Sequence, residues 1–92
     1  MAESNTKAWV YILASGRNGR YYIGHTTNIE QRLVAHERGV VKSTRHLRPW
    51  VLMYQEEHPT PAAARRREWY LKRLKSRRAL EELMASGRLP VH

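Results

Sequence analysis

Two short runs of β-forming residues, separated by a glycine-rich turn, constrain the fold of this chain more than any other feature. The first run, KAWVYILAS (Lys7 to Ser15), is apolar and short, which predicts a strand buried on both faces. GRNG follows, and its Asn18-Gly19 pair is a common signal for a tight turn. The next run, RYYIGH, predicts a second strand, so this segment is expected to form a β-hairpin.

Helical signals begin directly after the hairpin. Thr27 followed by Glu30 has capping-box spacing, which predicts a helix from there to about Arg38, where Gly39 would end it. GVVKSTRHLRP then reads as a basic loop, and WVLMYQEE has the β-forming composition of a third strand.

Two further helices are predicted in the last third of the chain. Thr60 and Pro61 have the residue types of an N-cap and first helical position, and a long helical segment follows them. Ser76 would cap a second helix, RRALEELMA, closed by Gly87 and Pro90. The resulting order, β-β-α-β-α-α, predicts an α+β fold: a small, three-stranded, mainly antiparallel sheet with helices packed on it.

The length and composition indicate one small domain. The 92 residues are expected to form a single unit over residues 1–92, with a core of about residues 7–85 and short flexible termini. There is no cysteine, which excludes disulfides and thiolate metal sites and fits a reducing compartment. No apolar run has the length of a membrane span and no signal-peptide pattern is present, so we expect a cytoplasmic protein without membrane association.

The charge of the chain points to a polyanionic partner. Lys and Arg number 17 against 8 Asp and Glu, and a stretch from Arg65 to Arg78 contains a single acid, Glu68. Such a stripe is typical of nucleic-acid binding, and the alternative is a solvated helix face kept soluble by charge. The basic residues expected to contact nucleic acid are Lys42, Arg45, Arg65, Arg66, Lys72, Lys75, Arg77 and Arg78.

The hairpin carries an aromatic pair. Tyr11 and Tyr22 face the same side if the connecting loop has two or four residues, because strand side chains alternate, whereas a three-residue loop would separate them. Gly24 would lie beside Tyr22 and leave space for a phosphate backbone, which makes it a candidate nucleic-acid contact. The alternative is a structural cross-strand aromatic pair with a bulge glycine.

The first predicted helix carries three polar side chains at spacings of four. Asn28, Arg32 and His36 would line one face of the helix, beside a core-facing edge formed by Ile29 and Leu33. An arginine there can grip a phosphate, and a histidine can donate to a phosphate oxygen or move a proton. The alternative is an ordinary amphipathic helix with a polar rim.

Glu68 is the one candidate metal ligand in the basic stretch. Mg²⁺ keeps most of its waters and often needs only one or two protein carboxylates together with substrate phosphates. The alternative is a salt bridge to Lys72, one helical turn later.

Together these segments resemble the GIY-YIG nuclease superfamily, in particular its short single-domain bacterial members. WVY (Trp9 to Tyr11) stands where the GIY motif belongs, YIG (Tyr22 to Gly24) is present as written, and ten residues separate them. TTNIEQRLVAH resembles the helix that follows, and KSTRHLRPWVLMYQE and AAARRREWYLKRLKSRRALEEL resemble the middle and end. The resemblance covers roughly Lys7 to Leu83.

The resemblance implies hydrolysis of a phosphodiester in DNA with one divalent ion, Mg²⁺ or Mn²⁺. Tyr11 would act as general base or water-positioner, and Tyr22 would help to orient the water and the phosphate. Arg32 would stabilise the charge developing on phosphorus, with His36 in support, and Glu68 would hold the metal. A repair, recombination or structure-selective endonuclease is the expected class.

The sequence departs from the family pattern in three ways. Trp9 and Val10 replace the Gly and Ile of the first motif, and no Asn follows Asn28, although members often place one late in the chain. No second domain is expected, so the lone domain would either cleave weakly or depend on a protein partner for targeting. The alternatives are a catalytically weak GIY-YIG domain that binds DNA or RNA, and a structural protein whose basic face docks an acidic partner.

Overall fold

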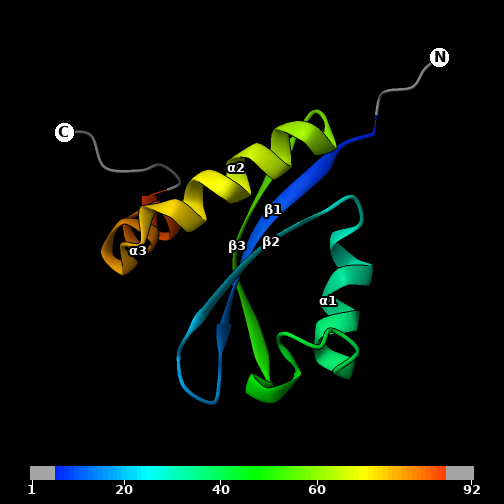
Figure 1. Cartoon of the computed structure of the whole chain (residues 1–92), viewed down its shortest axis with the longest axis vertical. Coiled ribbons are helices and arrows are strands. Elements are labelled where there is room, and N and C mark those ends of the chain that lie inside the picture. Colours follow the sequence, from blue (N-terminus) through cyan, green and yellow to red (C-terminus); the bar gives the residue numbers. More distant parts are fainter. Residues whose placement is uncertain (1–5, 87–92) are drawn as a thin grey trace.

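The sheet is built around the first strand. In the computed structural model, which describes residues 6–86, β1 (Ala8–Ser15) lies between β2 (Tyr21–Thr26) and β3 (Trp50–His58), and both pairings are antiparallel (Figure 1). β1 is buried along most of its length, as its apolar composition predicted. The three-stranded antiparallel sheet and the order β-β-α-β-α-α are confirmed.

The hairpin turn is a four-residue loop. The Ser15 N–H donates to the Arg20 carbonyl at 2.8 Å, and the Gly19 N–H donates to the Ser15 carbonyl at 2.9 Å. Gly19 has a φ of 76°, a left-handed conformation that glycine adopts without strain. The even loop length places Tyr11 and Tyr22 on one face of the sheet, and their ring centroids lie 6.3 Å apart.

The first helix begins one residue later than predicted. α1 (Ile29–Arg38) is capped by Asn28, whose side-chain oxygen accepts from the Gln31 N–H at 3.0 Å, and Gly39 ends it with a φ of 80°. The capping box at Thr27 is therefore wrong: Asn is as good a cap as Thr, and here Asn28 has the extended backbone that the cap requires. As the cap, Asn28 is no longer a free member of the polar face.

The remaining helices follow the predicted caps. A 3-10 turn, η1 (Arg45–Leu47), precedes β3, and α2 (Pro61–Leu74) and α3 (Arg77–Ser86) follow it. Thr60 accepts from the Ala63 N–H, and Ser76 accepts from the Ala79 N–H, both at 3.1 Å. The predicted stop at Gly87 and Pro90 and the predicted flexible termini lie outside the described residues.

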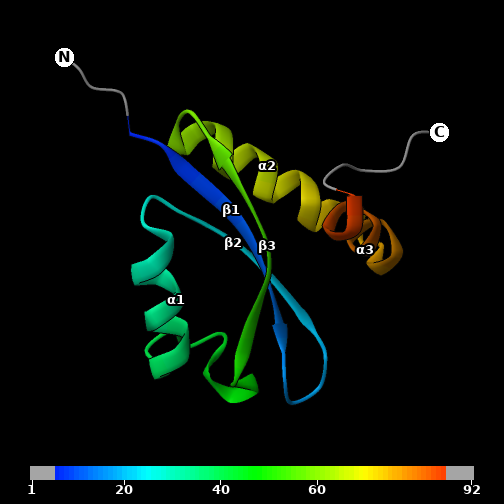
Figure 2. The ribbon, with the colours of Figure 1, turned by 180° about the vertical axis from the view of Figure 1, so that it is seen from behind.

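The helices cover opposite faces of the sheet, α1 on one side and α2 with α3 on the other (Figures 1 and 2). The apolar core lies under α2 and α3 and contains Ala8, Val10, Ile12, Ile23, Ala64, Leu71, Leu80 and Leu83. Arg67 also ties α2 to β3, because its guanidinium donates to the Glu56 carboxylate at 2.8 Å. Within residues 6–86, no helix is long and apolar enough to cross a membrane.

The face under α1 is more polar than the face under α2 and α3. His36 is the one buried residue of α1, whereas Ile29 and Leu33, predicted as its core-facing edge, are only half-buried. The reason is that the helix lies over Tyr11 and Tyr22, which present hydroxyl groups to it. This polar layer between α1 and the sheet is where the candidate site forms.

Candidate functional site

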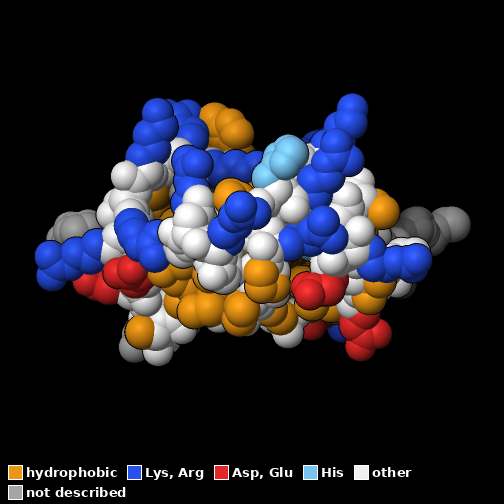
Figure 3. All heavy atoms as spheres, turned by 90° about the horizontal axis from the view of Figure 1, so that it is seen from below, with side chains coloured by type: hydrophobic (Ala, Val, Ile, Leu, Met, Phe, Trp, Pro, Cys, Tyr) orange, Lys and Arg blue, Asp and Glu red, His pale blue; other side chains and the backbone are white. Residues whose placement is uncertain are grey.

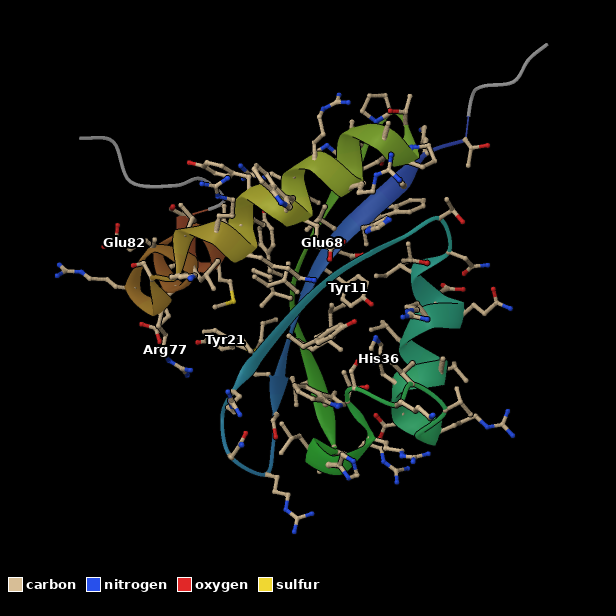
Figure 4. All side chains as sticks on the ribbon, viewed as in Figure 1. Tyr11, Tyr21, His36, Glu68, Arg77 and Glu82 are labelled. Atoms are coloured by element: carbon tan, nitrogen blue, oxygen red, sulfur yellow. The ribbon has the colours of Figure 1, made fainter. Side chains whose placement is uncertain are left out.

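A small open cleft forms at the β2 edge of the sheet, where α1 approaches from one face and α2 from the other. Its volume is about 160 Å³. The residues that line it are Tyr11, Tyr22, Gly24, His25, Arg32 and Glu68. Figure 4 shows Tyr11 and Glu68 close together, with His36 on the side of α1 that faces the sheet. Five of the six lining residues were candidates from the sequence, and His25 was not.

Gly24 is needed because the Tyr11 phenol lies directly over it. A Cβ at this position would lie 2.5 Å from the Tyr11 hydroxyl oxygen and 2.7 Å from its Cζ, and a buried ring cannot yield that space. The two residues are opposite each other in the β1–β2 pairing. The space above Gly24, expected to receive a phosphate backbone, is therefore occupied by Tyr11, although Gly24 still lines the cleft.

Tyr11 forms the floor of the cleft and is held by two residues of α1. The Arg32 Nε–H donates to its hydroxyl oxygen at 3.3 Å, and His36 Nε2 lies 2.9 Å from the same oxygen. Tyr11 is 0% exposed, so the other residues of the cleft lie between its side chain and solvent. Burial raises the pKa of Tyr11, and the Arg32 hydrogen bond opposes that rise without reversing it. Tyr11 is therefore a neutral phenol at pH 7.

His36 is enclosed and has both ring nitrogens engaged. It is 1% exposed, and its Nδ1 lies 2.8 Å from the hydroxyl of Thr44, itself fully buried. Since the Thr44 hydroxyl also points to the Val41 carbonyl, the geometry favours a ring that donates from Nδ1 and accepts at Nε2. Neither ring nitrogen faces the cleft, so this arrangement does not present His36 as a donor to a phosphate oxygen. His36 instead positions Tyr11.

Glu68 reaches the cleft from α2 as an ionised carboxylate. Its oxygens accept from the Lys72 ammonium at 2.5 Å and from the ring of His25. Burial works to raise the pKa of Glu68, but the hydrogen bonds from Lys72 and His25 outweigh it and hold the pKa below the ordinary value. The predicted Glu68–Lys72 pair is thus present. Glu68 still lines the cleft, so the salt bridge does not remove it from the site.

Comparison with known proteins decides the family. A family model described as the GIY-YIG catalytic domain matches residues 7–81 of this chain. The chain belongs to the GIY-YIG family. The matched residues include Tyr11, Tyr22, Arg32 and Glu68, and the resemblance drawn from the two half-motifs is confirmed.

Several bacterial relatives have a similar length. A UPF0213 protein of Xanthomonas campestris is 40% identical over 85 residues, which cover 91% of this chain and 83% of the relative. A UPF0213 protein of Streptococcus sanguinis is 43% identical over 74 residues, with coverages of 79% and 83%. The solution NMR structure of a UPF0213 protein from Bacillus halodurans is 35% identical, with a TM-score of 0.54 over 86% of this chain and 83% of that one.

Sequence reasoning missed two residues of this GIY-YIG domain. His25 follows the YIG tripeptide, and strand alternation turns it away from Tyr22 and toward α2, where it meets Glu68. The alternation of β2 side chains, combined with the expectation that a later helix packs on the opposite face of the sheet, would have indicated His25. Thr44 lies in the basic loop, and no local pattern relates it to His36, because the loop folds back under α1 only in the tertiary structure.

The predicted basic contacts of the GIY-YIG domain divide into two sets. Arg77 and Arg78 form ion pairs within α3, at 3.1 Å to Glu81 and 3.4 Å to Glu82, and Lys72 pairs with Glu68. The other five side chains are exposed and form no ion pair with another described residue: Lys42, Arg45, Arg65, Arg66 and Lys75. Figure 3 shows Lys and Arg gathered mainly along one side of the molecule, and apolar and acidic side chains along the other.

Arg77 has a structural role in addition to its charge. Its guanidinium lies 4.0 Å from the centroid of the Tyr21 ring and donates to the Gly19 carbonyl at 3.0 Å. These contacts join α3 to the hairpin loop. Part of the hydrogen-bonding capacity of Arg77 is therefore used within the domain.

The neutral state of His36 predicts a pH-dependent stability. Burial, together with the nearby Arg32 charge, lowers the pKa of His36 from 6.5 to about 4. Between these values the unfolded chain binds the extra proton, so the free energy of unfolding rises with pH. We expect the folded state to be about 2 kcal/mol less stable near pH 4.5 than near pH 6.5 from this group alone.

Urea unfolding of the parent and of His36→Asn at the two pH values measures this contribution. The variant is less stable throughout, but the part of the pH dependence that comes from His36 should disappear. Equal pH dependence in the two proteins would show that folding does not lower the pKa of His36.

Proposed function

We propose that this GIY-YIG domain is a metal-dependent endonuclease that hydrolyses phosphodiester bonds in DNA. The carrying observation is the convergence of Tyr11 from β1, Arg32 from α1 and Glu68 from α2 on one open cleft. The three elements are far apart in the chain, so these side chains meet only in the folded structure. Membership of the family supports a nucleic acid as substrate.

The side chains suit the stages of phosphodiester hydrolysis. Arg32 keeps a positive charge at the cleft, and its hydrogen bond to Tyr11 raises its pKa further. It would stabilise the charge that develops on the phosphate oxygens. Tyr11 and Tyr22 would orient the attacking water, and His36 would hold Tyr11 in position. Because Tyr11 is neutral here, water positioning is the role that its environment supports before a metal binds.

The donor set fits one hard divalent ion. Glu68 offers an ionised carboxylate at the cleft, and its present partners, Lys72 and His25, are partly exposed and can move aside. Residues 6–86 contain no cluster of three or more acidic, His or Cys side chains, so Mg²⁺ or Mn²⁺ would be held by Glu68, waters and the substrate phosphate. When bound, the ion would polarise the phosphate and lower the pKa of a bound water. Tyr11 would then not need to remove the proton from that water.

A binding module without cleavage is the second candidate. It is favoured by the raised pKa of Tyr11, which keeps this phenol from acting as a base at pH 7, and by the lack of an Asn after Asn28. In that case the protein would be a cytoplasmic one whose basic side chains bind DNA or RNA. A protein partner would supply the cleavage activity or the targeting. A repair or structure-selective role belongs to the first candidate only.

Metal removal separates the two candidates. We expect nicking of supercoiled plasmid and of branched DNA in Mg²⁺ or Mn²⁺, complete loss of nicking in EDTA, and recovery when the ion is restored. Arg32→Ala, purified identically, should bind DNA but not cut it, which controls for a contaminating nuclease. Binding without cleavage under all metal conditions would favour the module, and equal cutting by Arg32→Ala would refute the site.

A further inference from the structure

Trp69 is an exposed aromatic side chain in the middle of a basic helix. It lies on α2 and is 61% exposed. The Arg73 guanidinium, one turn later, lies 4.4 Å from the centroid of its ring. Leaving a tryptophan in water forgoes the burial of a large apolar surface, and tryptophan is enriched at binding surfaces.

Helix geometry connects Trp69 to the cleft. Successive residues are turned by about 100°, so Lys72 and Arg65 lie between Glu68, which lines the cleft, and Trp69, which is farther round the helix. Arg73 and Arg66 follow on the far side of Trp69. Except for Glu68 at the cleft, this strip contains no acid. It is continuous from the candidate site to the indole.

Nucleic-acid strands match the chemistry of this strip. Lysine and arginine neutralise phosphates, and an indole accompanied by a guanidinium offers a planar surface on which a base can stack. In a continuous duplex every base is already stacked and paired, so only an unpaired base can reach the ring. Tyr70 is also exposed, but its neighbour Arg67 is bound to Glu56 on the other side of α2.

We propose that Trp69 and Arg73 form a stacking site for an unpaired nucleobase of the strand that enters the cleft. DNA with a single-stranded segment is then bound more tightly than a continuous duplex. This inference rests on the proposed function, because that function places a nucleic-acid strand at the cleft. Trp69 is a substrate-binding residue in this proposal and takes no part in the chemistry.

Equilibrium binding in EDTA tests the site without cleavage. A fluorescently labelled single-stranded oligonucleotide and the corresponding duplex are titrated with the parent, Trp69→Ala, Trp69→Phe and Tyr70→Ala. Trp69→Ala is expected to weaken binding of the single strand about tenfold and to leave duplex binding unchanged. Trp69→Phe keeps an aromatic ring and should stay within about twofold of the parent, as should Tyr70→Ala, which removes a neighbouring exposed ring.

Abasic substitution identifies the base. Moving one abasic nucleotide along the single strand should find a position that weakens binding to the parent but not to Trp69→Ala. If Trp69→Ala binds both DNAs as the parent does while the parent still cuts DNA, the stacking site is refuted and the proposed function stands. If the parent binds neither DNA but binds polyglutamate, the stacking site and the proposed function are both refuted, and the strip docks an acidic protein.

Discussion

Glu68→Gln is expected to lower the rate of DNA cleavage by at least about 1000-fold at saturating metal. Glutamine keeps the size of the side chain but removes the charge that would hold a divalent ion, and metal stabilisation of a transition state is worth several kcal/mol. DNA binding should be unchanged or tighter, because the variant loses one negative charge near the substrate. Single-turnover cleavage, with binding measured in parallel, distinguishes the two effects.

Glu82→Gln is the matched control for this prediction. It makes the same change of charge on α3, where Glu82 pairs with Arg78 and lies away from Tyr11 and Glu68 (Figure 4). Its cleavage rate should equal that of the parent. Equal cleavage by Glu68→Gln and Glu82→Gln would exclude Glu68 as the metal ligand.

Tyr11→Phe is expected to lower cleavage by roughly 10²–10³-fold, the range typical of the loss of one positioned hydrogen-bonding group. The change keeps the aromatic ring over Gly24 and removes only the hydroxyl, to which Arg32 donates and beside which His36 lies. The cleft should therefore keep its shape and lose the group that orients the water. Rates should be compared at a temperature where the variant is fully folded, because one nitrogen of buried His36 loses its partner.

Tyr21→Phe provides the control for the loss of a hydroxyl. The Tyr21 hydroxyl donates to Glu81 at 3.2 Å on the exposed side of the hairpin, away from the cleft. This variant should cut at the parent rate. A Tyr11→Phe variant that cuts equally fast would show that the hydroxyl is not part of the reaction.

The fold was predictable from sequence because its elements are specified locally. Each signal depends only on residues a few positions away along the chain. Examples are the Asn18-Gly19 turn, the Thr60 and Ser76 caps and the apolar composition of β1. The wrong cap, at Thr27, arose where two neighbouring residues were both good caps, and the predicted strand ends differ from the observed ones by one residue. Local rules cannot rank such neighbours, because the choice depends on how far β2 continues.

The candidate site was predictable only as a set of residues. Sequence spacing indicated Tyr11, Tyr22, Arg32 and Glu68, but not that Tyr11 would fill the space over Gly24. That contact depends on the register of two strands and on burial from above. The enclosure of His36 by Thr44 likewise depends on a loop eight residues away returning beneath the helix.

The attachment of α1 has a consequence for how a substrate reaches the floor of the cleft. His36 is the one buried residue of α1, and hydrogen-bonding groups surround it, whereas the apolar core lies under α2 and α3. Lifting α1 would leave that core intact, so the local opening costs less free energy than global unfolding. The same movement uncovers Tyr11 and withdraws Arg32. Access to Tyr11 therefore depends on the local stability of α1, to which the hydrogen bonds of His36 contribute.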